Sequence, residues 1–465
     1  MTVHAALSYR EAIQAALADG FRFGGLHAAE GGAVVRTVLV GPEGTVRVES
    51  VRATGDSVPT IVDLVPAAGW DEREAHDLYG VGFDGHEPLR PLVEHDPTLS
   101  HWTVHVKGED AYQVAVGPIH AGVIESGHFR IHVVGDRILH LDARLFYKHR
   151  GLERAAEGSS LEHGAAYVGR ACAACAVANR LAYAHACEDT RGLDATPELA
   201  RARTILLELE RTWSHLNDIA AVCAGVGLAA GNTHFAALTE RARRLNAVVG
   251  GHRFLFGAVE VGGSSLDLDA DAVRRAREEL GRIRGEASRG WRELQFNASF
   301  QDRLPDVGVL RPEEVDRLGT VGPAARAAGV ARDVRADSPR LDYPGFQPRT
   351  PERPDGDVRA RLEQRALELG QSFDVLGRLL DGPVRPALAT AARSGSAIGV
   401  GLVESARGAT LCVVEREGDR LARVRLRTGS YANWPSVAFA AADNLLPDFP
   451  LINKSFELCY ACADR

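Results

Sequence analysis

Short β-branched runs alternate with helical spacing over the first hundred residues, which predicts a small mixed unit at the start of the chain. A stretch rich in Pro, Gly and Asp follows at 84–100 and is typical of a connection between domains. The expected elements of this unit are a helix over 9–19, a hairpin formed by 33–40 and 45–51 around the turn 41–44, a strand over 58–66, and a helix through Glu72, Ala75 and Leu78.

Farther along, a β signal covers 111–146 and is followed by long amphipathic patterns. Ile205, Leu209, Trp213 and Leu216 recur at the spacing of one buried helical face. Helices are expected over roughly 155–192, 196–228, 233–260, 268–296 and 357–381, an irregular segment over 300–356, and strands over 409–416 and 422–428 before the terminal segment.

These patterns predict an α+β protein with two structural units. The first is a small N-terminal α/β domain over 1–95, and a linker is expected over 96–110. The second, over 111–465, is expected to combine β-sheet with a bundle of long helices.

Charge and hydropathy exclude some classes of function. The net charge of -8 argues against a nucleic-acid surface, which needs clustered Lys and Arg. The sequence has no run of 18 or more apolar residues, so no direct membrane span is expected. Arg10, Glu11 and Asp19 interrupt the first apolar pattern, which therefore predicts an amphipathic helix and not a signal peptide. A cytoplasmic protein is expected, with any membrane association made through partners.

The cysteines provide the main chemical signal. Seven are present, and an odd number without a signal peptide argues against a disulfide framework. Four of them form two Cys-x-x-Cys pairs, Cys172 with Cys175 and Cys459 with Cys462, a whole domain apart. Soft thiolates select Zn, Ni, Cu(I) or iron. One interpretation is a metal shared by the first bundle helix and the C-terminal segment; the others are buried apolar cysteines or a redox dithiol.

The residues around both pairs resemble a known family. Residues 149–153 with Arg170-x-Cys-x-x-Cys resemble the N-terminal nickel-binding signature of hydrogenase large subunits, and 453–465 resembles the C-terminal signature of their membrane-bound, energy-converting branch. The segments 117–120, 125–129, 210–216 and 322–335 are similar to the core that these subunits share with the 49-kDa-type subunit of complex I, and 70–86 is similar to the 30-kDa-type signature. The fused order resembles that of formate hydrogenlyase large subunits.

The resemblance implies a nickel–iron centre. Cys172 and Cys459 would be terminal nickel ligands, while Cys175 and Cys462 would bridge to an iron that carries CO and cyanide. Arg407 matches the arginine suspended over the metal site, where it would polarise hydrogen and contact cyanide.

Three more residues match family positions. Glu125 matches the proton-relay glutamate; the alternative is a solvated loop carboxylate. Glu153 matches a position that helps to bind Mg²⁺; the alternative is an ion pair with Arg150 or Arg154. Ser430 matches a serine that hydrogen-bonds a cyanide, and the alternative is an ordinary serine at a strand end.

Some positions depart from the family pattern. Ala173 replaces a glycine and Asn179 replaces a histidine, while Ala406 and Leu458 each replace a proline. These changes leave the four cysteines intact but alter their surroundings, which tune metal affinity and reactivity. They bear on hydrogen turnover more than on metal binding.

The expected function is that of the catalytic large subunit of a membrane-associated [NiFe]-hydrogenase-like oxidoreductase, which interconverts H2 with protons and electrons. The chain has no cysteine set suited to an Fe–S cluster, so electrons are expected to pass to a small [4Fe–4S] subunit, with further ferredoxin-like and ion-pumping membrane subunits. One alternative is an NADH:quinone oxidoreductase C/D-type subunit without nickel, but complex I relatives lack the cysteine pairs. The other is a zinc-bound or vestigial scaffold of such a complex.

Overall fold

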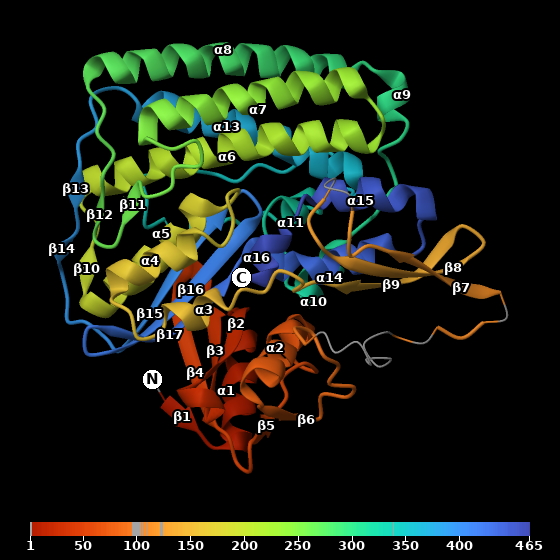
Figure 1. The fold of residues 1–465 in the computed structure, drawn as a ribbon, viewed down its shortest axis with the longest axis vertical. Coiled ribbons are helices and arrows are strands. Elements are labelled where there is room, and N and C mark those ends of the chain that lie inside the picture. The colour runs from red at the N-terminus through yellow and green to blue at the C-terminus, as the bar shows by residue number, and fades with distance from the viewer. Residues whose placement is uncertain (1, 95–103, 105, 109, 121–123, 338) are drawn as a thin grey trace.

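A computed structural model describes residues 2–94, 104, 106–108, 110–120, 124–337 and 339–465. The fold is mixed α+β, as the sequence predicts, and is arranged in layers (Figure 1). Most of the predicted linker 96–110 lies outside the described residues, so the domain boundary stays a prediction.

The N-terminal unit is built on a four-stranded sheet in the order β1-β4-β3-β2. Its own core contains Tyr9, Ile13, Leu39 and Val51. Its elements are β1 Thr2–His4, α1 Ala6–Ala18, β2 Arg22–Ala29, β3 Val34–Val40, β4 Val46–Arg52, β5 Ser57–Pro59, α2 Gly69–Tyr79 and β6 Gly82–Asp84. The predicted hairpin is confirmed, because β3 and β4 pair antiparallel.

The strand predicted over 58–66 is mostly wrong. Only β5 is extended, and the chain then turns. The carboxylate of Glu72 accepts hydrogen bonds from the Ile61 N–H at 2.8 Å and from the Thr60 hydroxyl at 2.7 Å. These backbone and side-chain groups are therefore bound by α2 instead of a neighbouring strand.

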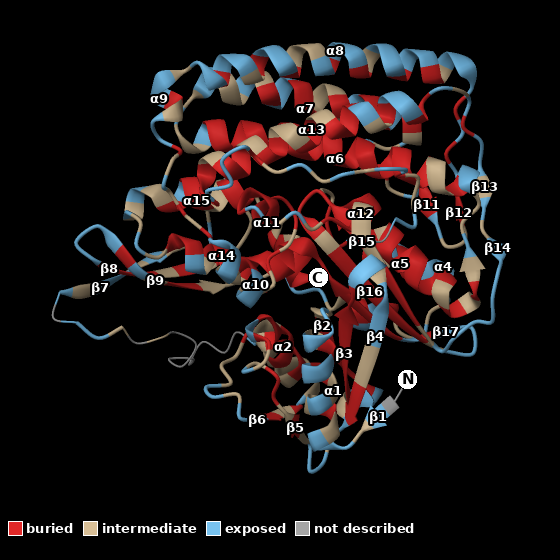
Figure 2. Cartoon of the chain, turned by 180° about the vertical axis from the view of Figure 1, so that it is seen from behind, coloured by how far each residue is buried: buried red, intermediate tan, exposed pale blue. Residues whose placement is uncertain are grey.

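A helical bundle covers one side of the molecule. Nearly every residue in the middle of α6 is buried, whereas the outer face of α8 is exposed (Figure 2). Side-chain caps begin three of these helices, from Thr196, Asp269 and Asp357. The long helices are α5 Ala176–Arg191, α6 Pro197–Gly225, α7 Ala229–Gly250, α8 Ala270–Gln295 and α13 Val358–Leu379.

A central antiparallel sheet joins the bundle to the N-terminal unit. It consists of β15 Ile398–Ser405, β16 Gly408–Glu417 and β17 Arg420–Arg427. Helix α5 lies so close to β15 that a Cβ at Gly401 would stand 1.9 Å from the Ala182 carbonyl oxygen, so this position requires glycine. Elsewhere on the sheet, Leu411 and Val413 pack against Val38 of β3.

A second antiparallel sheet packs on the C-terminal helices. The predicted strands appear as β7 Ala111–Val116, β8 His128–Val134 and β9 Arg137–Arg144. Their core is shared with helices that sequence patterns did not predict, because these helices are short and the first contains Pro435. They are α14 Gly429–Ala441, α15 Phe449–Phe456 and α16 Tyr460–Asp464.

Shorter elements connect these layers. Among the described residues, no helix combines the length and the apolar character needed to cross a bilayer. The connecting elements are α3 Leu152–Ala156, α4 Leu161–Gly169, β10 Leu193–Asp194, β11 Val259–Glu260, β12 Gly263–Ser264, α9 Ala298–Gln301, α10 Pro312–Leu318, α11 Pro323–Ala327, α12 Val334–Asp337, β13 Ala387–Leu388 and β14 Thr390–Ala391.

Candidate metal centre

The two cysteine pairs meet in space, as predicted. The sulfur atoms of Cys172, Cys175, Cys459 and Cys462 all lie within 4.8 Å of one another. The first pair lies in the turn between α4 and α5 and not on a helical face, since Cys175 directly precedes α5. The second pair spans the start of α16. Two segments far apart in the sequence thus form one cluster.

A buried carboxylate fixes the turn that carries the first pair. Glu210 of α6 accepts hydrogen bonds from the N–H groups of Val177 and Ala178, at 2.6 and 3.1 Å. These are donors of the first turn of α5, which have no partner within the helix. Burial raises the pKa of Glu210 to about 8, although these N–H groups act in the opposite direction. Sequence reasoning quoted Glu210 in a motif but gave it no role.

The cluster concentrates groups that become negatively charged. The Ala174 N–H donates to the Cys172 sulfur at 3.2 Å, and the Asn179 amide donates to Cys462 at 3.8 Å. Hydrogen bonds from the neighbouring thiols lower the pKa of Cys172 well below its usual value, while the same contacts raise the pKa of Cys175. The cluster therefore favours ionisation of Cys172 and disfavours ionisation of Cys175 and Cys462.

A cavity of about 340 Å³ opens beside the cluster. Its walls come from the cysteines, from the loop before β8, from α6 and from the β15–β16 turn. Lining residues include Glu125, Cys172, Trp213, Arg407, Glu457 and Cys459.

Arg407 reaches this cavity from the turn between β15 and β16. Its Nη2 donates to Asp218 Oδ1 at 2.8 Å, and its Nε donates to the Glu457 carbonyl at 3.0 Å. Its Nη1 is buried and has no hydrogen-bond partner among the described residues. Burial lowers the pKa of this guanidinium, but Asp218 and the nearby cysteines outweigh burial and hold the pKa well above its ordinary value. Asp218 is a further site residue that sequence reasoning missed; its only signal is its place three residues after His215 on α6.

Glu125 and Ser430 both contact the segment that carries the second pair. The Glu125 carboxylate accepts a hydrogen bond at 2.8 Å from the N–H of Ala461, which lies between the two cysteines. The Ser430 hydroxyl accepts from the Cys459 N–H at 3.0 Å. Ser430 belongs to the first turn of α14, so the alternative of a strand-end serine is wrong.

Glu153 lies in a different environment. Its carboxylate is 3.3 Å from Arg423, 3.7 Å from Arg425 and 3.5 Å from Arg465. Glu153 does form ion pairs, as the alternative predicted, but not with Arg150 or Arg154. Its partners are two arginines of β17 and Arg465. Arg150 instead donates to the Ala171 carbonyl at 2.7 Å. The Mg²⁺ role of Glu153 stays a prediction, one that three neighbouring cations disfavour.

The donor set fits a thiophilic metal. Four sulfurs at this separation match the way thiolates share soft or borderline ions. The unpartnered Arg407 Nη1 provides a donor toward an anionic ligand in the same cavity.

Comparisons with known proteins identify the family of the chain. Residues 27–103 match the family model of the 30 Kd subunit of respiratory-chain NADH dehydrogenase, and residues 226–395 match that of the 49 Kd subunit. Formate hydrogenlyase subunit 5 of Escherichia coli is 31% identical over 90% of this chain and 79% of its own length. The chain belongs to the family of membrane-bound, complex-I-related hydrogenase large subunits, with both regions fused.

The chain is also similar to subunits of other oxidoreductases. A C/D-type NADH-quinone oxidoreductase subunit of Phocaeicola vulgatus is 28% identical, over 70% of each chain. A chain of the membrane-bound sulfane sulfur reductase, an archaeal respiratory membrane complex, has a TM-score of 0.71 at 25% identity and covers 78% of this chain and all of its own. The relatives of this chain thus include subunits of hydrogenases, of complex I and of a respiratory membrane complex, so a peripheral position with partner subunits is expected.

Proposed function

We propose that this chain is the catalytic large subunit of a membrane-associated [NiFe]-hydrogenase-like oxidoreductase, which interconverts H2 with protons and electrons. The observation that carries the proposal is the cluster of four cysteine sulfurs within 4.8 Å, with the guanidinium of Arg407 on the wall of the same cavity. A subunit that binds only quinone has no need of such a thiol cluster. Electrons would leave through a small [4Fe–4S] partner subunit.

The four cysteines would hold the metals as thiolates. Cys172 and Cys459 would act as terminal nickel ligands, and Cys175 and Cys462 as bridging ligands to iron. When bound, a nickel–iron centre with CO and cyanide on iron supplies an open coordination position for splitting or forming H2. The Ser430 hydroxyl fixes the backbone of Cys459, and Glu210 fixes the turn that follows Cys175.

The surrounding side chains would manage charge and protons. Asp218 orients Arg407, whose free Nη1 can contact an anionic ligand or polarise hydrogen in the cavity. Glu125 lines that cavity and is half-buried, so its carboxylate can take a proton released there and pass it outward. Asn179 donates to Cys462 and would modulate the basicity of that sulfur.

Metal content separates this proposal from its alternatives. Protein purified with its native partners is expected to contain nickel and iron and to show infrared bands of CO and cyanide. An NADH:quinone oxidoreductase-type subunit would contain neither metal, and a structural scaffold would contain zinc alone. Either of these results would refute the proposal.

A further inference from the structure

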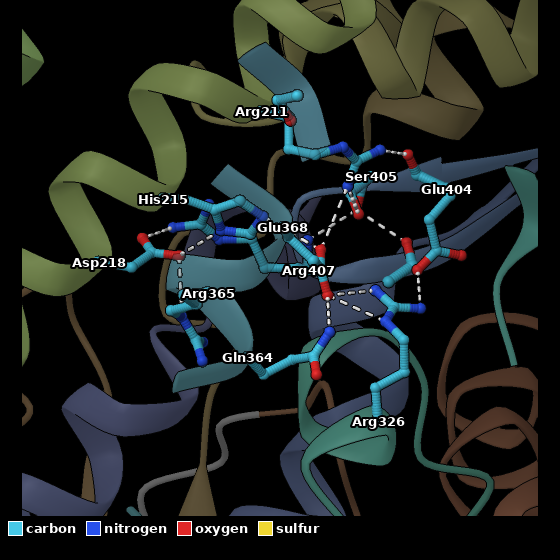
Figure 3. Close-up of polar contacts among 12 residues, drawn as sticks. Arg211, His215, Asp218, Arg326, Gln364, Arg365, Glu368, Glu404, Ser405 and Arg407 are labelled. Carbon is cyan, nitrogen blue, oxygen red and sulfur yellow. Dashed lines mark hydrogen bonds and ion pairs between the residues drawn. The ribbon is translucent and has the colours of Figure 1, made fainter. Parts of the chain in front are cut away.

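A row of buried polar side chains begins at Arg407, which lines the cysteine cavity, and continues into the protein (Figure 3). Behind Arg407, Asp218 Oδ2 lies 3.7 Å from His215 Nδ1, and His215 Nε2 lies 3.1 Å from Glu368 Oε2. None of these four side chains is more than 3% exposed. His215 and Asp218 lie on α6 and Glu368 lies on α13, so this row of side chains passes through the interior of the bundle.

The end of this row of side chains that lies farthest from Arg407 reaches a second cavity. Arg326 of α11 donates to Glu368 at 2.9 Å and to Glu404 at 2.9 Å. Glu404 lines a cavity of about 460 Å³ between the N-terminal unit and the central sheet, with Phe23, Val40 and Leu411 among its walls. The two cavities are therefore linked by close polar contacts between buried side chains, in which the 3.7 Å step from Asp218 to His215 is the longest and is not a hydrogen bond.

Arginines and carboxylates are paired along this row of side chains and among its immediate partners. Each arginine in it lies against at least one carboxylate, as Arg335 does with Asp333 at 2.7 Å and Arg365 with Asp218 at 3.1 Å. Charges in such an interior interact more strongly than in water. A charge added at one end therefore changes the electrostatic potential at the other end, unless the uptake or release of a proton compensates it. The five arginines are Arg211, Arg326, Arg335, Arg365 and Arg407, and the five carboxylates are Glu208, Asp218, Asp333, Glu368 and Glu404.

Glu404 is the member best placed to exchange a proton. Burial and the neighbouring Asp333 raise the pKa of Glu404 to about 7, against the opposing effect of Arg326, Arg335 and Arg211. The charged and titratable groups around it are Arg211 from α6, Arg326 from α11, Asp333 and Arg335 at α12, His185 from α5 with Arg340 and Tyr343 across a small gap, and Arg22, Asp316, Arg317, Arg332, Asp337 and Arg427 around the cavity.

We propose that Glu404 is a proton-uptake group of the second cavity, and that its proton affinity follows the charge at the cysteine cavity through Asp218, His215, Glu368 and Arg326. Negative charge gained at the cysteines draws a proton from solvent onto the Glu404 carboxylate, and loss of that charge returns the proton. Use of this coupling during turnover rests on the proposed function, but the coupling itself needs no metal.

An infrared titration of the full chain without added metal tests the coupling. The band of a protonated buried carboxyl is assigned to Glu404 by its loss in Glu404→Gln. Asp218→Asn removes a negative charge at the cysteine end and is expected to lower the proton affinity of Glu404 by about threefold or more. Arg407→Gln removes a positive charge and is expected to raise it by a similar factor. Asp374→Asn changes an exposed carboxylate elsewhere on α13 and should leave the midpoint unmoved.

Opposite shifts in the two variants support the proposal, because general structural damage gives no reason for opposite signs. Equal midpoints, shifts in the same direction, or no Glu404 titration near neutral pH would overturn it. If Asp218→Asn does not fold, Arg365→Gln replaces it. Both arginine variants remove a positive charge and should then raise the proton affinity of Glu404, so a lowered or unchanged midpoint in either would overturn the proposal. Absence of nickel from the native protein would refute the proposed function and leave this titration decisive.

Discussion

Two buried polar clusters include residues of the C-terminal segment. They differ in whether side chains of opposite charge neutralise their acidic groups. In the arginine cluster (Arg423, Arg425 and Arg465 with Glu74 and Glu153), each oxygen of the two carboxylates accepts a hydrogen bond. The cysteine cluster gathers four acidic groups of the same kind, with weak donors at 3.2 and 3.8 Å.

This difference indicates that the arginine cluster stabilises the fold, whereas the cysteine cluster is suited to bind a cation. Opposite charges from three parts of the chain satisfy one another in the arginine cluster, which joins the N-terminal unit to the central sheet and to Arg465. Burial raises the pKa of Glu74, but Arg425 and Arg465 outweigh burial and lower it to about 2. Thiolates cannot neutralise one another, so the four cysteines can all be ionised only with a cation from outside the chain.

Removal of one cysteine is expected to have the largest effect. Cys459→Ser should reduce the metal content of purified protein by about tenfold or more, because a hydroxyl is a poor ligand for soft metals. Elemental analysis measures this directly. Cys187→Ala, which alters a buried cysteine of α5 outside the cluster, serves as the control and should keep its metal. Full metal content in Cys459→Ser would show that the cysteine cluster does not bind the metal and would contradict the proposed contrast with the arginine cluster.

The second prediction concerns the acidic wall of the cysteine cavity. Glu125→Gln is nearly isosteric and should keep folding and metal content, yet lower hydrogen turnover by roughly a hundredfold or more, because the amide cannot relay a proton. Hydrogen uptake and evolution assays measure the rate. Glu162→Gln, an exposed carboxylate of α4, is the matched control. A metal-loaded Glu125→Gln protein with full activity would exclude Glu125 from proton transfer.

For the arginine cluster, a structural effect is expected instead. Glu153→Gln removes one of the two carboxylates that the three buried arginines share and leaves Glu74 in place. It should lower the free energy of unfolding by roughly 3 kcal/mol, with unchanged nickel and iron content. Chemical denaturation and metal analysis of the same samples test both statements. Loss of bound Mg²⁺ at unchanged stability would instead support the metal role of Glu153.

The smallest effect is expected at Ser430. Ser430→Ala removes the acceptor for the Cys459 N–H and should cost about 1 kcal/mol of stability, with the metals retained. Thermal unfolding of the metal-loaded protein measures the loss. A variant as stable as the parent protein would show that this contact does not hold the cysteine segment.

Most long helices were predictable because each repeats apolar residues along one face over several turns, as α6 and α8 do. The single helix predicted over 155–192 is wrong, because the turn at 170–175 that carries Cys172 and Cys175 separates α4 from α5. The C-terminal helices were not, since short segments carry little periodicity. At the site, the cysteine spacing and the surrounding motifs predicted which sulfurs meet. Asp218 and Glu404 could not be found in this way, because their roles arise from contacts between distant segments: Asp218 with Arg407, and Glu404 with Arg326.

X-ray absorption at the nickel edge, on protein purified with its native partners, tests the central claim most directly. The account predicts nickel coordinated by four sulfurs, and fewer sulfurs after Cys459→Ser or Cys172→Ser. A nickel signal that is absent, or one dominated by oxygen and nitrogen ligands in the parent protein, would contradict it.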